Sequence, residues 1–336
     1  MRKISTVLVL LALFQFGCKE KETPIEVHAT PNDILVINEG NFNLGNASIS
    51  LLDQQYDLKP SIFEHANGRK VGDVLQDVVR HNNSIYIVVN NSGRIEKLNN
   101  SSLISEAYND AFVSPRKICF YDSTRAYVSD LYNDALYEIN PTTLKINKEI
   151  PCFGWTEDLL IWKEQLFVVN VEREKLLVFN PNTNQFVDSL SLPKMPGNML
   201  MDKHNNIWVY CAGETNQAAK LVKLSPAPLQ IITTFELPVL KEFYPRLAMN
   251  TAKDELFILN SGVFQLNVAA LQLGARLIEG KDKSFYGLGI NNQNNDILLS
   301  EIVGFNSPSF IHVYDSKGNL KKTNIKSGII TSQFVN

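Results

Sequence analysis

Short apolar runs, each ending at a polar or small residue, recur along this chain. Seven of them are rich in β-branched and aromatic residues, which favour strands: ILVINEG, IYIVVNN, AYVSDLY, LFVVNVE, IWVYCAG, LFILNSG and ILLSEIV. Their shared end positions lie 40 to 52 residues apart and are Asn38, Asn90, Asp130, Asn170, Cys211, Asn260 and Glu301. A strand repeat of this length is typical of a β-propeller.

Further strand patterns flank the seven runs. A second strand follows most of them, as in GRIEKLN and DALYEIN, and another precedes every run but the first, as in VLQDVVRHNN. We find no helical period in the chain after its N-terminal segment, so the pattern predicts an all-β, seven-bladed β-propeller with four strands per blade. The C-terminal stretch SGIITSQFVN is left over. We expect it to be the inner strand of blade one, so that N- and C-terminal strands pair in one blade and close the ring.

The stretch FEHANGRKVGDVLQDVVRH, residues 63–81, is a long polar connection between two such strands. In this register it joins the outer strand of blade one to the inner strand of blade two. We expect it to contribute to the face around the mouth of the central channel, with Gly68 and Gly72 adopting positive φ. The alternative is a solvated loop that binds nothing.

The N-terminus has a different character. Arg2 and Lys3 precede an apolar run over residues 4–16, which is too short to span a bilayer but suits a secretory signal. The following Gly17–Cys18 resembles the lipobox of bacterial lipoproteins. The resemblance implies a signal peptide over 1–17 and a lipidated Cys18. The polar stretch that follows, which contains Pro24, predicts a tether over 18–30, and the strand repeat assigns 31–336 to the propeller. A plain secretory peptide is the alternative.

The residues after Cys18, KEKETP, resemble the surface-export signal of Bacteroidetes-type lipoproteins. This implies a protein on the cell-surface side of the outer membrane, with membrane contact through its lipid anchor alone.

Composition narrows the function classes. The chain has 336 residues, of which 44% are hydrophobic, and a net charge of −3 without a basic run, which argues against a nucleic-acid partner. Beyond Cys18 the cysteines are Cys119, Cys152 and Cys211, an odd number that leaves at least one unpaired. Cys119 and Cys211 lie in apolar strand patterns and are expected to be buried. The five histidines are isolated from one another, so no metal and no required cofactor are expected.

Two neighbouring motifs carry a family resemblance. NEGNFNLGNASISLLD, followed by ANGRKVGDVLQDV, resembles the opening of the YncE-like surface lipoproteins of Bacteroidetes, which include the cobalamin-capturing BtuG proteins. The resemblance implies a propeller that binds a large cofactor, cobalamin or a related corrinoid, and passes it to a TonB-dependent outer-membrane transporter.

The residues predicted for the channel-mouth face are aromatic, Asn or Arg, which suit a large, flat, partly polar ligand. Loops between the two middle strands of a blade supply Asn41, Phe42, Tyr132, Arg173, Phe264 and Phe305. Loops before the inner strands supply Arg116, Trp155, Tyr244, Arg246, Phe285 and Tyr286. Arg116 and Arg246 each follow a proline, which favours the channel mouth, whereas Trp155 and Tyr286 equally suit packing between blades.

Two other functions fit the pattern. Glu39, Asn90, Asp130, Asn170, Asn260 and Glu301 form a predicted ring of oxygen ligands for Ca²⁺, as in propeller lactonases. However, Asn and Asp at strand ends also make local turns, Cys211 interrupts the ring, and no histidine is placed as a base. We therefore expect no enzyme activity. A structural or protein-docking propeller without a small ligand is the remaining alternative.

Overall fold

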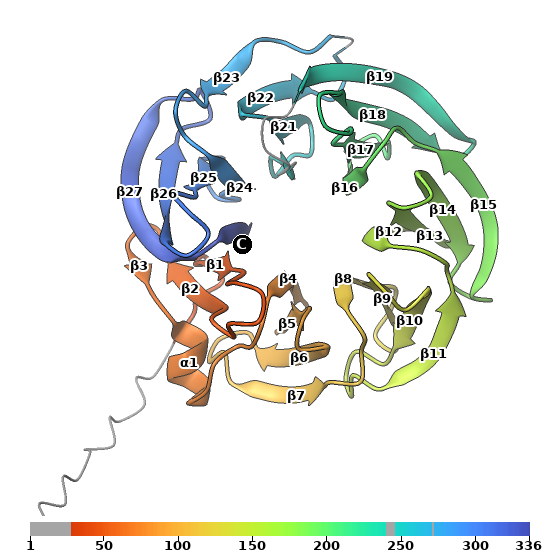
Figure 1. The fold of residues 1–336 in the computed structure, drawn as a ribbon, viewed down its shortest axis with the longest axis horizontal. Coiled ribbons are helices and arrows are strands. Elements are labelled where there is room, and N and C mark those ends of the chain that lie inside the picture. The colour runs from red at the N-terminus through yellow and green to blue at the C-terminus, as the bar shows by residue number, and fades with distance from the viewer. Residues whose placement is uncertain (1–27, 240–245, 271) are drawn as a thin grey trace, which may run out of the picture.

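A computed structural model describes residues 28–239, 246–270 and 272–336. Within these residues, seven four-stranded antiparallel sheets are arranged around a central axis (Figure 1). The predicted all-β, seven-bladed propeller is confirmed. The predicted signal peptide and Cys18 lie outside the described residues.

In each blade the four strands follow one another from the axis outward. Blade one consists of β28 (Thr331–Val335), β1 (Ile34–Asn38), β2 (Ser48–Leu52) and β3 (Leu58–Lys59). Blade two consists of β4 (Leu75–His81), β5 (Ser84–Val89), β6 (Arg94–Asn99) and β7 (Ser105–Asn109). Blade three consists of β8 (Pro115–Phe120), β9 (Ala126–Asp130), β10 (Ala135–Ile139) and β11 (Ile146–Pro151). Blade four consists of β12 (Thr156–Trp162), β13 (Gln165–Asn170), β14 (Lys175–Asn180) and β15 (Gln185–Ser191).

The remaining blades follow the same order. Blade five consists of β16 (Pro196–Met201), β17 (Ile207–Cys211), β18 (Ala218–Pro226) and β19 (Leu229–Val239). Blade six consists of β20 (Arg246–Met249), β21 (Glu255–Leu259), β22 (Gly262–Asn267) and β23 (Arg276–Glu279). Blade seven consists of β24 (Phe285–Ile290), β25 (Ile297–Glu301), β26 (Pro308–Tyr314) and β27 (Leu320–Ile329).

The two ends of the chain close the ring in blade one, as predicted. β28 pairs antiparallel with β1, and Thr331 Oγ1 donates a hydrogen bond of 2.6 Å to Asn38 Oδ1. One detail of the prediction is wrong, because residues 327–329 of the stretch SGIITSQFVN still belong to β27, the outer strand of blade seven. Closure pairs the inner edge of β1, which would otherwise be exposed in the channel.

The long connection after blade one contains a helix, contrary to the expectation from sequence. α1 (Ile62–Asn67) lies at the outer side of blade one (Figure 1) and buries Ile62 and Phe63 against blades one and two. Because β3 has only two residues, the helix covers an edge that β3 leaves short. Among the described residues, no helix is long and apolar enough to cross a membrane.

Both glycines of this connection have positive φ, as predicted. Gly68 (φ 64°) ends α1, with its N–H bonded to Glu64 O at 2.8 Å. Gly72 (φ 134°) lies where a Cβ atom would come within 2.8 Å of Ser92 Oγ, so the glycine also allows close packing.

Buried tyrosines connect neighbouring blades at the face opposite the channel mouth. Tyr86 Oη donates to the Pro141 carbonyl and Tyr127 Oη to the Pro181 carbonyl, each at 3.0 Å. In both pairs the tyrosine lies on the second strand of one blade and the proline in a turn of the next. These bonds satisfy the hydroxyl groups within an otherwise apolar contact.

Candidate functional site: the mouth of the central channel

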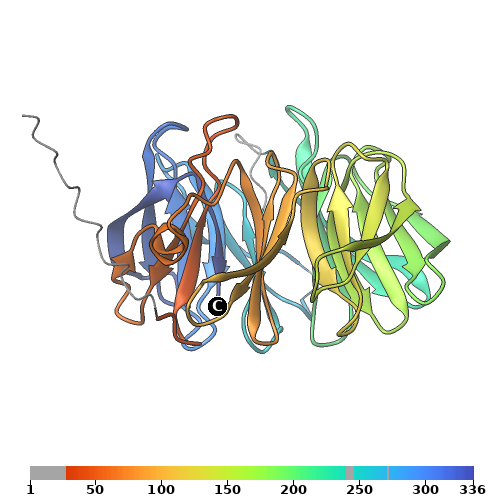
Figure 2. The same ribbon diagram turned by 90° about the horizontal axis from the view of Figure 1, so that it is seen from below.

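The loops that join the second and third strands of each blade open on one face of the disc. Figure 2 shows the loops over 40–47, 212–217 and 303–307 rising on this face, which we call the top face. The loops before the inner strands open on the same face, as expected from the sequence.

Irregular strand pairing turns polar residues toward the channel just below the top face. The register of six inner strands shifts near their first residues, for example between Pro115 and Ile118 and between Thr156 and Leu159. A bulge sets consecutive residues opposite one partner, so two successive side chains can face the same side. Polar doublets at these positions line the channel and are Gln76–Asp77, Arg116–Lys117, Glu157–Asp158 and Ser332–Gln333.

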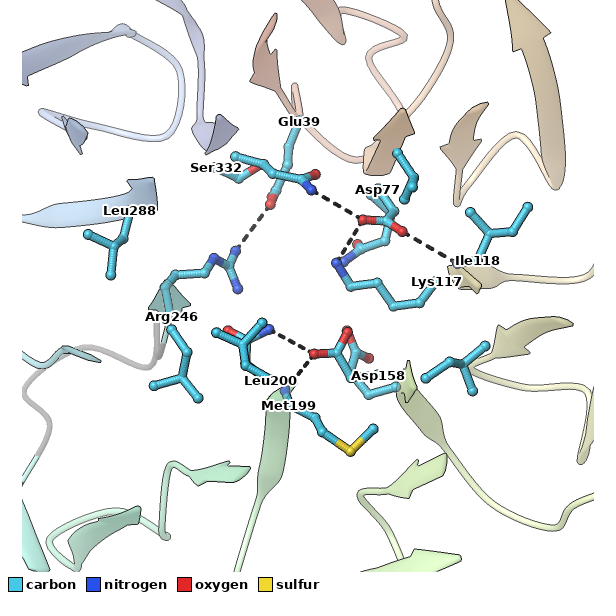
Figure 3. A pocket seen from close by; sticks show the side chains of 17 residues that line it. Glu39, Asp77, Lys117, Ile118, Asp158, Met199, Leu200, Arg246, Leu288 and Ser332 are labelled. Carbon is cyan, nitrogen blue, oxygen red and sulfur yellow. Dashed lines mark hydrogen bonds and ion pairs between the residues drawn. The ribbon is translucent and has the colours of Figure 1, made fainter. Parts of the chain in front are cut away.

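Two connected cavities lie along the axis. The upper one, which we call the mouth, has a volume of about 360 Å³, and all seven blades contribute to it through their strands or adjoining loops. The lower one, which we call the chamber, has a volume of about 280 Å³ (Figure 3). They share the lining residues Glu39, Gln76, Glu157, Asn198 and Arg246, so the chamber lies directly beneath the mouth.

One side of the mouth is formed by an arginine, a glutamate and an aromatic residue. Arg116 and Glu157 form two hydrogen bonds of 2.9 and 3.0 Å, and Trp155 Nε1 donates to Glu157 at 2.8 Å. The Arg116 guanidinium lies 5.9 Å from the Trp155 ring centroid. Burial raises the pKa of Glu157, but the adjacent Arg116 charge and its hydrogen bonds outweigh burial and hold that pKa below its ordinary value.

A second unit of the same composition comes from blades six, seven and one. Tyr286 Oη donates to Glu39 at 2.9 Å, and Arg246 lies 3.5 Å from the same carboxylate. The Arg246 guanidinium is 5.3 Å from the centroid of the Tyr286 ring. The mouth therefore presents two arginines whose charges are each balanced by a glutamate, together with two aromatic rings.

The chamber contains one further ion pair and one carboxylate without a described cation partner. Lys117 Nζ lies 3.0 Å from Asp77 Oδ1. Burial raises the pKa of Asp158 to about 6, and the nearby Glu157 and Asp77 charges add to this effect, whereas Lys117 and the Met199 N–H oppose it. Asp158 therefore changes its charge close to neutral pH.

Exposed apolar side chains surround the mouth on the top face. Phe42 is 66% exposed, Phe305 is 51% exposed and Tyr132 is 74% exposed. The loops of blades one and seven touch, since Asn41 Nδ2 donates to the Phe305 carbonyl at 2.6 Å. Leu44 and Val303 lie in the same two loops and are also exposed. We call Phe42, Leu44, Val303 and Phe305 the rim patch.

The predicted site residues divide into several groups. Arg116, Trp155, Arg246 and Tyr286 line the mouth. Phe42, Tyr132 and Phe305 are on the exposed rim, and Asn41 holds two rim loops together. Tyr244 lies outside the described residues.

Three predicted positions differ in the structure. Phe264 is in strand β22, not in a loop, because the turn before it is only Asn260–Ser261, and it is buried in the core. Phe285 is 5% exposed and packs edge-on against His312. Arg173 stacks on Phe153 at 5.6 Å in a groove beside blade four, away from the mouth.

Sequence reasoning missed several lining residues. Glu39 appeared only in the proposed calcium ring, and Gln76, Glu157, Asp158 and Asn198 were not selected. Their signal was present as a polar doublet at the start of an inner strand, as in LQDVV and TEDLL. The sequence does not show that a bulge turns both members inward.

The residues of the predicted calcium ring have protein partners: Glu39, Asn90 and Asn260 bond to other blades, and the remaining three bond within their own blades. Asp130 Oδ1 accepts from the Tyr132 and Asn133 N–H groups, Asn170 Oδ1 accepts from the Arg173 N–H, and Glu301 bonds to Lys283 and His312. These are the local turns of the alternative explanation, with an added ion pair at Glu301. The described residues contain no group of three or more His, Cys, Asp or Glu side chains placed to hold a metal ion. The three described cysteines are unpaired.

Comparison with solved structures shows the same fold in proteins of very different sequence. A quinonprotein alcohol dehydrogenase-like protein from Bacteroides thetaiotaomicron superposes with a TM-score of 0.73 at 13% identity, over 90% of this chain and 77% of the other. A protein from Lactobacillus plantarum superposes with a TM-score of 0.68 at 10% identity, over 91% of this chain and 99% of the other. A functionally unknown protein from Desulfotomaculum acetoxidans superposes with a TM-score of 0.67 at 11% identity, over 90% of this chain and 97% of the other. Identities this low establish the fold alone.

The fold and the axial site define a seven-bladed propeller with a polar mouth. Residues 32–329 match a family described as a domain of unknown function, DUF5074, and the chain belongs to that family. No curated protein matches the sequence.

Proposed function

We propose that this protein is a cell-surface lipoprotein that captures a bulky, amide-rich cofactor of the corrinoid class at its mouth. In this proposal it then passes the cofactor unchanged to a TonB-dependent outer-membrane transporter. The observation that carries the proposal is the pair of arginine–glutamate–aromatic units inside an exposed aromatic rim. The lipobox-like start and the resemblance to YncE-like and BtuG lipoproteins support the location and the ligand class.

The chemistry of the mouth favours a ligand that is large, flat and without strong net charge. Trp155 and Tyr286 offer ring surfaces, while Phe42 and Phe305 extend the apolar contact outward. Because each mouth arginine is paired with a glutamate, neither guanidinium is an uncompensated anion site. A corrin ring fringed with carboxamides matches these surfaces, since amides donate to the carboxylates and accept from the guanidinium groups.

Capture without turnover is supported by the composition of the cavity walls. Among the described residues, no histidine or cysteine lines the mouth or the chamber. Ser332 lines the chamber beside Lys117 and four carboxylates, but none of the described hydrogen bonds joins its hydroxyl to these groups, so the described residues form no base–nucleophile pair on these walls.

The experiment is a titration of purified protein with cobalamin, cobinamide, haem and a ferric siderophore, followed by calorimetry. The proposal predicts micromolar or tighter binding of the two corrinoids and recovery of the ligand chemically unchanged. Binding of haem or siderophore alone would refute the ligand class, and conversion of the bound compound would refute capture without turnover.

A second candidate, protein docking without a small ligand, is favoured by the rim patch. Four large apolar side chains from two touching loops are exposed at one side of the mouth, which is common at protein contacts. The substitution Phe305→Ser tests it. Docking predicts lost association with the transporter and no corrinoid binding by the wild type.

A further inference from the structure

The chamber beneath the mouth contains polar groups that the mouth itself does not use. Its volume of about 280 Å³ corresponds to several water molecules or a side arm of a few heavy atoms, but not to a macrocycle. Since the chamber and the mouth share five lining residues, an arm extending from a ligand in the mouth would enter it directly.

The cations of the chamber and mouth are already engaged. Lys117 pairs with Asp77, Arg116 with Glu157, and Arg246 with Glu39. Asp158 is the fourth carboxylate of this set, and none of the described ion pairs includes it. The chamber therefore has one negative charge more than these pairs balance.

Hydrogen bonding at Asp158 is also incomplete. Its Oδ2 accepts from the Met199 N–H at 2.7 Å and from Asn198 Nδ2 at 3.4 Å (Figure 3). Its Oδ1 accepts none of the hydrogen bonds in the described part of the chain. Asn198 Oδ1 is buried and likewise has no donor among the described residues. Asp158 Oδ1 is therefore an acceptor open to the chamber, whereas Asn198 Oδ1 is enclosed by protein and Asn198 contributes through the bond from its Nδ2 to Asp158.

We infer that the chamber is a second subsite, in which Asp158, positioned by Asn198 and the Met199 N–H, binds a hydrogen-bond-donating arm of the captured ligand. The arm is a primary carboxamide or an ammonium group, because each carries at least two N–H donors. A carboxylate arm would bring a further negative charge beside Asp158, Asp77 and Glu157, so it is rejected. This inference rests on the proposed function for the ligand in the mouth. It adds that the chamber selects ligands with a carboxamide arm over ligands with a carboxylate arm.

The test compares cobalamin with its side-chain monocarboxylates, in which one carboxamide is hydrolysed. Wild type is expected to bind at least one monocarboxylate about tenfold more weakly than cobalamin. Asp158→Asn removes the charge and should reduce that difference, whereas Asn198→Ala should weaken cobalamin itself several-fold. Asp57→Asn is the matched control, because the Asp57 side chain is 76% exposed and lies outside both cavities.

A second measurement separates this inference from the proposed function. Propionamide, propylammonium and propionate are followed by ligand-observed NMR against wild type and Asp158→Asn. The subsite is supported if wild type binds propionamide and propylammonium but not propionate, and if Asp158→Asn loses or reverses this preference. This outcome supports the subsite even where cobalamin fails to bind. Equal binding of cobalamin and all monocarboxylates by wild type and variants would overturn the subsite and leave capture at the mouth standing. An absence of binding by all probes would overturn both.

Discussion

Arg116 and Glu157 meet across the boundary between blades three and four through two parallel hydrogen bonds of 2.9 and 3.0 Å. Arg116 also donates to Gln76 of blade two at 2.8 Å, so one side chain connects three blades at the channel mouth. Side-chain exposures of 16% and 12% place the pair largely out of water. The ion pair therefore holds the mouth in shape as well as forming its surface.

Breaking this pair from one side should destabilise the propeller. Arg116→Gln or Glu157→Gln alone should lower the free energy of unfolding by about 3 kcal/mol, since the partner is left buried and uncompensated. The double variant should cost much less than the sum, measured by denaturant unfolding. Lys203→Gln, which removes a single-contact and more exposed pair with Asp254, is the control and should cost below about 1 kcal/mol. Additive losses in the double variant would show that the two side chains are not coupled.

Ring closure should be a major source of stability. Deleting residues 331–336 removes β28, leaves β1 unpaired at the channel and should cause aggregation or a large loss of thermal stability. The milder Thr331→Val removes the bond to Asn38 and should cost about 1–2 kcal/mol, against no measurable change for Thr142→Val in an exposed turn. A truncated protein that melts within a couple of degrees of the full chain would contradict closure through blade one.

The pH dependence of stability should report on Asp158. Its pKa is about 6 in the folded protein against 3.8 ordinarily, so the folded state binds this proton more tightly than the unfolded chain. The resulting stability is present below about pH 4 and is lost as the pH rises to about 6, where the buried charge forms. Asp158→Asn should therefore stabilise the protein by about 1–3 kcal/mol at pH 8 and hardly at about pH 3.5. Thermal unfolding of wild type and Asp158→Asn at both pH values measures this difference in stability. An equal gain at the two values would rule out titration as the cause.

The fold could be predicted from the sequence because the same strand pattern repeats seven times along the chain. Each apolar run ends at a comparable polar position, and the leftover C-terminal strand has one vacant place in the ring. The helix over 62–67 was missed because six residues are too few to show a helical period beside stronger strand patterns.

The site was predicted unevenly for geometric reasons. Arg116 and Arg246 were placed correctly because a proline before an inner strand locates its start. Phe264 and Phe285 were predicted to lie in loops at the channel mouth, but Phe264 is inside β22, Phe285 begins β24, and both side chains are buried. Glu157 and Asp158 depend on a bulge, which sequence alternation does not predict.

The anchor is testable without knowledge of the ligand. In a host that processes lipoproteins, Cys18→Ala should release the protein from membranes, because the lipid is the proposed attachment. Fractionation followed by high-salt washing and surface protease treatment of intact cells measures both anchoring and exposure. A Cys18→Ala protein that stays with the membrane through the wash would place the anchor elsewhere.

The central claim, capture of a corrinoid at the mouth, is tested most directly by calorimetry of cobalamin with wild type and Arg246→Gln. Arg246 lines both cavities and stacks on Tyr286, so its loss should weaken binding by about 5- to 150-fold, or about 1–3 kcal/mol. Lys203→Gln, at an exposed position away from the channel, should bind as wild type does. The account predicts a saturable heat at micromolar protein that falls in Arg246→Gln alone. An absence of heat with wild type, or equal affinities in all three proteins, would contradict it.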